Sequence, residues 1–158
     1  MKKIKFIQKL VKEEVITTKG PSLEIGNSYH KKAENSLRAA KILIKQDLLE
    51  ESTTMSYYSM YHKATALLLL LGIKCENHNA TILILKEVLN LDTKDFSDAK
   101  DERIDKQYYT DSKTKKQDAT NLIKKAELFI EKLDYFVDEL THDSRNKILY
   151  NFKKTYFN

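Results

Sequence analysis

The sequence has few of the residues that interrupt or cross-link a polypeptide chain. Its 158 residues include one proline, three glycines, one cysteine and no tryptophan. Because glycine and proline mark turns and break helices, their scarcity favours helices throughout the chain. The single cysteine, Cys75, excludes a disulfide framework within the chain and indicates a reducing compartment.

Long hydrophobic runs are also missing. The longest apolar run covers residues 66–71, far short of the ~20 residues that a membrane-spanning helix needs. Residues 1–12 lack the apolar block of a signal peptide. We therefore expect a soluble, cytoplasmic protein without a membrane partner. The length predicts one domain that buries about two-thirds of the surface its unfolded chain exposes.

The charge balance is moderately positive. The chain carries 28 lysines and arginines against 23 acidic residues, a net charge of +5. This surplus is compatible with a polyanionic partner but modest for a dedicated nucleic-acid binder. Lysines gather in residues 2–12 and again in residues 113–125. Solvated helix faces and loops explain both groups as well as an anion-binding surface does.

Apolar residues at spacings of three and four predict a series of amphipathic helices. The predicted helices cover residues 4–17, 25–48, 55–71, about 77–89, about 95–108, and a long last segment from Thr114 that extends past Arg145. The helix at residues 55–71 is apolar almost all round and should occupy the centre. The fold class is therefore all-α: an up-and-down bundle of four to five helices (residues 21–158) with a basic N-terminal helical extension (residues 1–20).

Side chains that cap helices predict where several of these helices begin. Ser22 is a candidate N-cap for the second helix, Thr53 or Thr54 for the third, and Asn77 or Asn79 for the fourth. Thr114 and Gln117 have the spacing of a capping box.

Ready-made chemical motifs are mostly absent. The sequence has no glycine-rich phosphate loop, no Walker lysine motif and no helical pair of metal-binding histidines. Cys75 and His78 have a C-x-x-H spacing that suits zinc or a nucleophile and base pair, but no second pair completes a tetrahedral site. We expect neither a metal nor a cofactor, and interpret His78 as a helix-capping residue.

The most unusual segment, residues 56–78, reads SYYSMYHKATALLLLLGIKCENH. On a helix Tyr58 and His62 share a face, and Tyr57 neighbours Tyr61. One turn therefore offers several hydroxyls and an imidazole. Two interpretations remain open: the rings are core residues whose polar tips reach the bundle end or a dimer partner, or they form a functional site.

A second segment, residues 102–109, reads ERIDKQYY and contains one of only three arginines in a chain with 25 lysines. The planar guanidinium of Arg103 suits a carboxylate or a phosphate. Arg103 can pair locally with Asp101 or Asp105, or with a carboxylate on another helix, and a buried structural pair is the more common outcome.

Together these segments resemble the HEPN domain family, in particular its small UPF0332-type proteins. The resemblance covers about residues 21–137 and includes SYHKKAENSLRAAKILI before the tyrosine-rich segment. The positions that carry it are Tyr57, Tyr58, Met60, Tyr61, His62, Gly72, Ile73, His78, Arg103 and Tyr108. It implies a helical bundle that usually dimerises and often pairs with a minimal nucleotidyltransferase in toxin–antitoxin systems.

Many HEPN domains are metal-independent ribonucleases in which an arginine is followed, after four to six residues, by a histidine. Here no histidine follows Arg38, Arg103 or Arg145 at those spacings. RNKILY, from Arg145, has Tyr150 in the histidine position, and a phenol with a pKa near 10 is a poor general base. The resemblance therefore assigns the fold without assigning an enzyme.

The leading hypothesis is a dimeric HEPN protein that binds a nucleotide or RNA as part of a toxin–antitoxin or defence pair. His62 is the acid–base candidate and Arg103 the phosphate clamp. The predicted binding residues are Tyr57, Tyr58, Tyr61, His78, Asp105 and Tyr108. The alternatives are a non-catalytic dimeric interaction module, a ribonuclease with an unusual site, and a protein whose Tyr108 or Tyr150 accepts a nucleotidyl group.

Overall fold

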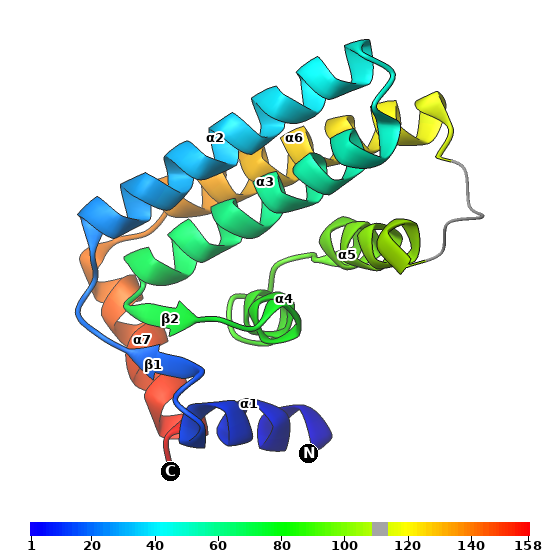
Figure 1. Ribbon diagram of the computed structural model, residues 1–158. Helices are drawn as coiled ribbons and strands as arrows, with labels where there is room; N and C mark the ends of the chain where they lie inside the picture. Colours follow the sequence, from blue (N-terminus) through cyan, green and yellow to red (C-terminus); the bar gives the residue numbers. More distant parts are fainter. Residues whose placement is uncertain (109–113) are drawn as a thin grey trace.

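The computed structural model describes residues 1–108 and 114–158, and the side chains of residues 105–108 lie outside that description. Helices dominate it, joined by one two-stranded sheet (Figure 1). The elements are α1 (Lys2–Lys12), β1 (Ile16–Thr18), α2 (Leu23–Lys45), α3 (Leu49–Leu70), β2 (Ile73–Cys75), α4 (His78–Glu87), α5 (Lys94–Tyr108), α6 (Lys116–Asp138) and α7 (His142–Tyr156). The predicted helical class is confirmed. Among the described residues, no helix combines the length and apolar composition needed to span a bilayer.

Helix α3 lies at the centre, as predicted. It packs against α2, α4, α5, α6 and β2 (Figure 1). Ser52 and Ser59 of α3 are fully buried. The Ser52 hydroxyl donates to the Ala40 carbonyl oxygen of α2 (2.8 Å), and the Ser59 hydroxyl donates within α3 to the Ser56 carbonyl oxygen (2.6 Å). Burial on nearly every face explains why α3 has no single apolar stripe.

Two predicted caps are confirmed and two are wrong. The Ser22 side chain accepts from the Ile25 amide (3.3 Å) and the Asn77 side chain from the Ala80 amide (2.9 Å). Helix α3, however, begins at Leu49, so Thr53 is buried inside it rather than capping it. Two glutamates in its first turn favour this earlier start through the helix dipole. Lys115, with no side-chain cap bond, precedes α6 in place of a Thr114 capping box.

The predicted continuous last helix is also wrong. Helix α6 ends at Asp138, and α7 starts at His142 after a capping box in which the Thr141 hydroxyl accepts from the Ser144 amide (3.1 Å). Such a box satisfies the free amides of a helix start and so stabilises a new helix at this point. The change of direction lets α7 bury Phe152 and Tyr156 beside α1 (Figure 1).

The small sheet was not predicted. The first helix stops at Lys12 instead of continuing to Thr17, and Glu14 turns the chain with a φ of 57°. The following β-branched residues favour an extended conformation, and β1 pairs antiparallel with β2, with Ile16 opposite Cys75 and Thr18 opposite Ile73. The N-terminal segment is thereby tied to the end of α3.

Candidate functional site

The tyrosine-rich turn of α3 meets residues from α4 and α5 in one group of rings. We call this group the aromatic cluster; it consists of Tyr57, Tyr58, Tyr61, His62, His78 and Arg103. Four members come from consecutive turns of α3, His78 opens α4, and Arg103 lies on α5. Because residues three and four apart share a helix face, α3 presents its rings to both neighbours.

Tyr57 and His78 form the buried side of the cluster. The Tyr57 hydroxyl and Nδ1 of His78 share a hydrogen bond of 2.5 Å. Tyr57 is fully buried, and its ring stacks on Phe96 with the ring centres 5.7 Å apart. Burial raises the pKa of Tyr57 well above the ordinary value of a phenol, which is near 10. Tyr57 therefore remains a neutral phenol that orients His78.

His78 is also stacked on Tyr61. The two ring centres are 3.9 Å apart and the ring planes differ by 16°. Burial lowers the pKa of His78, and the nearby Arg103 charge lowers it further. Burial raises the pKa of Tyr61 to about 12. Near neutral pH this part of the cluster consists of a neutral imidazole between two neutral phenols.

Arg103 bridges α5 to α3 through Tyr58. Its Nη1 donates to the Tyr58 hydroxyl (2.7 Å), and its guanidinium carbon lies 5.2 Å from the centre of the same ring. The guanidinium carbon is also 5.3 Å from the centre of the Tyr57 ring, within cation–π range. Its Nε is buried and has no hydrogen-bond partner in the described part of the chain. Asp101 ion-pairs with Lys100 (3.3 Å).

His62 lies on the other side of Tyr58. The two ring centres are 5.7 Å apart, and Tyr29 of α2 approaches the imidazole at 5.9 Å. Burial, together with the charge of Lys32, lowers the pKa of His62. Its Nδ1 is buried without a hydrogen-bond partner among residues 1–104 and 114–158. The His62 side chain is partly exposed, and a neutral imidazole can exchange a proton with a group that reaches it.

The structure thus brings His62 and Arg103 to the same ring, that of Tyr58. Tyr57, Tyr61 and His78 adjoin them. The side chains of Asp105 and Tyr108 lie outside the described residues, although their backbone belongs to α5. Tyr150 is 65% exposed on α7.

Comparison with known proteins decides the family. The HEPN domain model matches residues 27–136, more than half of the chain. The chain belongs to the HEPN domain family. The aromatic cluster is therefore built within the matched HEPN region.

Individual relatives agree with this assignment. The chain is 32% identical to a UPF0332 protein of Archaeoglobus fulgidus over 108 residues, which cover 65% of this chain and 86% of the relative. It is 40% identical to a UPF0332 protein of Gloeobacter violaceus over 58 residues, covering 37% of this chain and less than half of that relative (46%). A Methanocaldococcus jannaschii protein named as a candidate toxin is 27% identical over 115 residues, covering 68% and 85%.

Cys75 is not hydrogen-bonded to His78 in the described structure. Its sulfur donates to the Asn77 carbonyl and accepts from the Thr81 hydroxyl, both at 3.5 Å. Burial raises the pKa of the thiol, which disfavours the reactive thiolate, and His78 is engaged with Tyr57. In the described part of the chain no group of three or more histidine, cysteine or acidic residues is arranged to hold a metal ion.

A hollow of about 570 Å³ opens beside Tyr58 and Arg103. Its rim includes Glu50 and Glu51, from the first turn of α3. These carboxylates oppose a phosphate approaching from that side, whereas the His62 side of Tyr58 has Lys32 as its nearby charge.

Sequence reasoning missed one neighbour of the cluster and one buried ion pair elsewhere on α3. Tyr29 belongs to the predicted apolar stripe of α2, and nothing in its spacing indicates a contact with His62. Lys63 is buried at 5% exposure, where its ammonium donates to Asp134 and lies 2.8 Å from Nδ1 of His30. A lysine directly after a histidine carries no sequence signal for a buried ion pair.

Proposed function

We propose that this HEPN protein binds RNA, or a nucleotide from it, at the aromatic cluster, as the toxin-like member of a pair with a minimal nucleotidyltransferase. Arg103 contacts phosphate, and His62 is the acid–base group. The observation that carries the proposal is that Nε of Arg103 and Nδ1 of His62 are both buried and unpaired in the described structure, on either side of Tyr58. Both side chains are partly exposed, so a bound group can reach them and use hydrogen-bonding capacity that the described protein atoms leave unused.

The chemistry of these side chains suits an RNA backbone. A neutral imidazole can remove a proton from a 2′-hydroxyl, and a guanidinium can offset the charge that develops on the adjacent phosphate. The missing arginine-to-histidine spacing does not prevent this arrangement, because Arg103 of α5 and His62 of α3 meet through Tyr58. Tyr58 and Tyr61 are both partly exposed, so the accessible parts of their rings can contact a bound base, although His62 and Arg103 flank Tyr58 and His78 stacks on Tyr61.

The distribution of charge supports a polyanionic partner. Residues 1–20 contain six lysines against two glutamates, and residues 142–158 contain four basic residues against one acidic residue. Residues 21–141 contain 18 basic and 20 acidic residues. The positive surplus thus lies on α1 and α7, where it can attract RNA over several ångströms before the cluster is reached.

RNA binding can be tested with a labelled single-stranded RNA in fluorescence anisotropy at several salt concentrations. We expect binding that weakens steeply with salt, because phosphate contacts release counterions. Arg103→Lys keeps the positive charge but removes the planar, two-pronged set of guanidinium donors. We expect the affinity for RNA to fall about tenfold, since a hydrogen bond to a charged group contributes ~1.5–3 kcal/mol. The matched control is Arg38→Lys, at an exposed arginine of α2.

Cleavage is measured on the same RNA with EDTA present, comparing the wild type with His62→Ala. Loss of cleavage with retained binding supports the acid–base role of His62. Equal cleavage by both proteins removes that role, and salt-independent or absent RNA binding by the wild type overturns the proposal.

The second candidate function is a dimeric interaction module without catalysis. It is favoured by Glu50 and Glu51 beside Arg103 and by the slight acidic excess of residues 21–141, both of which suit a protein partner better than a phosphate. Co-expression with a minimal nucleotidyltransferase tests this function. Light scattering then measures whether the two proteins form a complex, and mass spectrometry measures the intact mass of this chain. A stable complex without RNA binding favours the module, and one added nucleotide mass identifies a tyrosine acceptor such as the exposed Tyr150 or Tyr108.

A further inference from the structure

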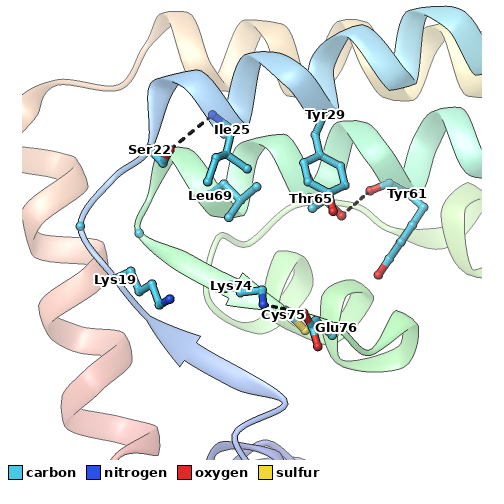
Figure 2. A pocket seen from close by; sticks show the side chains of 12 residues that line it. Lys19, Ser22, Ile25, Tyr29, Tyr61, Thr65, Leu69, Lys74, Cys75 and Glu76 are labelled. Atoms are coloured by element: carbon cyan, nitrogen blue, oxygen red, sulfur yellow. Dashed lines mark hydrogen bonds and ion pairs between the residues drawn. The ribbon is translucent and has the colours of Figure 1, made fainter.

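A cavity of about 380 Å³ lies between the bundle and the small sheet. Figure 2 shows Ile25 and Tyr29 of α2 together with Tyr61 and Leu69 of α3 on one side of it, and Lys19 and Lys74 on the other. Protein interiors are close-packed, and voids larger than a water molecule are few. The volume of this cavity falls instead within the ~300–1,000 Å³ of small-molecule sites.

The walls of the cavity are mostly apolar, with two aromatic faces. Tyr29 and Tyr61 are each partly exposed and contribute one ring each. Leu69 and Ile25 complete this side, and Ile25 is 51% exposed although it is a large aliphatic residue. A flat apolar body that enters the cavity would remove these surfaces from water.

The opposite side of the cavity is positively charged. The Lys74 ammonium ion-pairs with Glu76 (2.6 Å), so these two charges largely cancel. The Lys19 ammonium has no ion pair or hydrogen bond with any described residue. Lys19 directly follows β1, and its amide donates to the Gly72 carbonyl (3.0 Å). Lys74 lies on β2, which pairs with β1. One uncompensated positive charge therefore faces an apolar cavity.

The wall that carries Lys19 is a feature of the N-terminal part of this chain. Lys19, Gly20, Ser22 and Ile25 all precede residue 27, where the HEPN match begins. The segment is locked in place by Gly72, whose φ of +80° and lack of a Cβ allow the Lys19 carbonyl to approach; a Cβ would lie 2.6 Å from that oxygen. The cavity thus exists because the N-terminal segment closes over the end of α3.

We propose that this cavity binds a small amphipathic anion, with a flat aromatic body between Tyr29 and Tyr61 and a carboxylate or phosphate group at Lys19. The site is separate from the hollow beside Arg103, but it adjoins the aromatic cluster through Tyr61. Tyr61 lines the cavity, and its ring stacks on His78 with the ring centres 3.9 Å apart. A ligand in the cavity therefore contacts the ring that supports His78 in the aromatic cluster.

The test is a ¹H–¹⁵N NMR titration of the full chain with 2-naphthoate, phenyl phosphate and the neutral 2-naphthol. We expect saturable shifts at the amides of Thr65, Leu69, Gly72 and Lys74 with both anions, and weaker binding of the neutral compound. Comparison of the carboxylate with the phosphate shows which anionic group the site prefers. Lys19→Ala should weaken both anions about two- to fivefold, the range expected for one exposed ion pair, and leave the neutral compound unchanged.

Two variants locate the binding. Thr65→Phe, which fills the cavity from α3, should abolish the shifts, and Tyr29→Leu, which removes one ring on a partly exposed position, should weaken binding even if the larger substitution does not fold. The control is Lys45→Ala, at an exposed lysine of the opposite end of α2. Absence of saturable shifts, shifts that persist in both cavity variants, or equal weakening by Lys45→Ala overturns the proposal.

The outcome can be told apart from that for RNA binding, although Tyr61 adjoins both sites. A chain that fails to bind RNA but binds 2-naphthoate retains this site and loses only the function proposed for the aromatic cluster. The opposite outcome retains the RNA site and removes this one.

Discussion

The bundle helices α2 to α6 and the terminal segments α1, β1 and α7 differ in charge but share one hydrophobic core. The terminal segments hold most of the positive surplus, whereas residues 21–141 are slightly acidic. Yet Ile7 of α1, Phe152 of α7 and Phe96 of α5 are all buried in the same apolar cluster. The HEPN match ends at residue 136, before α7, and begins at residue 27, after β1.

This difference shows that segments outside the matched HEPN range can carry a different charge and still share its core. The matched range supplies the aromatic cluster, while α1 and α7 contact one another (Figure 1) and carry positive charge. The N-terminal segment also supplies Lys19 to the cavity.

The largest effect is expected from removing a phenylalanine in either region. Phe96 and Phe152 are 0% and 1% exposed, and we expect Phe96→Ala and Phe152→Ala each to lower the free energy of unfolding by ~3–5 kcal/mol. Chemical denaturation followed by circular dichroism should show one transition in each variant, because both rings belong to one cluster. A separate early transition in Phe152→Ala alone would mean that the terminal segments unfold independently of the bundle.

A smaller effect is expected at the junction of the two regions. Gly72 has a φ of +80°, which costs an L-residue ~1–2 kcal/mol, and its added Cβ would collide with the Lys19 carbonyl. Gly72→Ala should therefore destabilise the protein by at least that amount in a denaturant titration. Gly20→Ala is the matched control: no atom lies within 4 Å of its added Cβ, and we expect no loss of stability. Equal stability of the two variants would contradict the close junction.

The smallest effect is a pH dependence that arises from two histidines of the bundle. The pKa values of His62 and His78 are lowered in the folded protein by burial and nearby positive charge. As the pH falls, the histidines of the unfolded chain therefore bind protons at a higher pH than those of the folded protein. The free energy of unfolding is at its full value above an ordinary histidine pKa of about 6.5 and decreases as the pH drops below it. Both rings are partly exposed, so we expect a loss below about 1 kcal/mol.

The measurement for this effect is the free energy of unfolding between pH 7.5 and pH 5.5. His62→Gln combined with His78→Gln should reduce the slope. His142→Gln, at an exposed histidine of α7, should leave it unchanged. A slope that follows His142 instead would place the titrating group in the terminal segments.

Much of the fold follows from local signals in the sequence. The Ser22 and Asn77 caps and the central position of α3 are read from residue type and spacing, because capping and amphipathicity involve residues within one or two turns. The small sheet is different. Its two strands, Ile16–Thr18 and Ile73–Cys75, have three residues each, and such short strands form only when a distant partner is present. The break between α6 and α7 was missed because the apolar spacing continues across it, although Thr141 and Ser144 have a capping pattern.

The candidate site divides in the same way. That Tyr58 and His62 share a face follows from helical spacing. That Arg103 reaches Tyr58, that Tyr29 reaches His62 and that Tyr57 holds His78 depends on how α2, α4 and α5 pack against α3. No spacing along the chain encodes those contacts.

By itself, the sequence determined the helical class, most of the helices and the residues that identify a HEPN domain, because these depend on local periodicity and on motifs. Only the tertiary structure decided which rings meet Arg103, which described polar atoms remain buried without partners, and how the N-terminal segment closes a cavity. Those properties arise from contacts between residues tens of positions apart, where packing geometry rather than local preference sets the outcome.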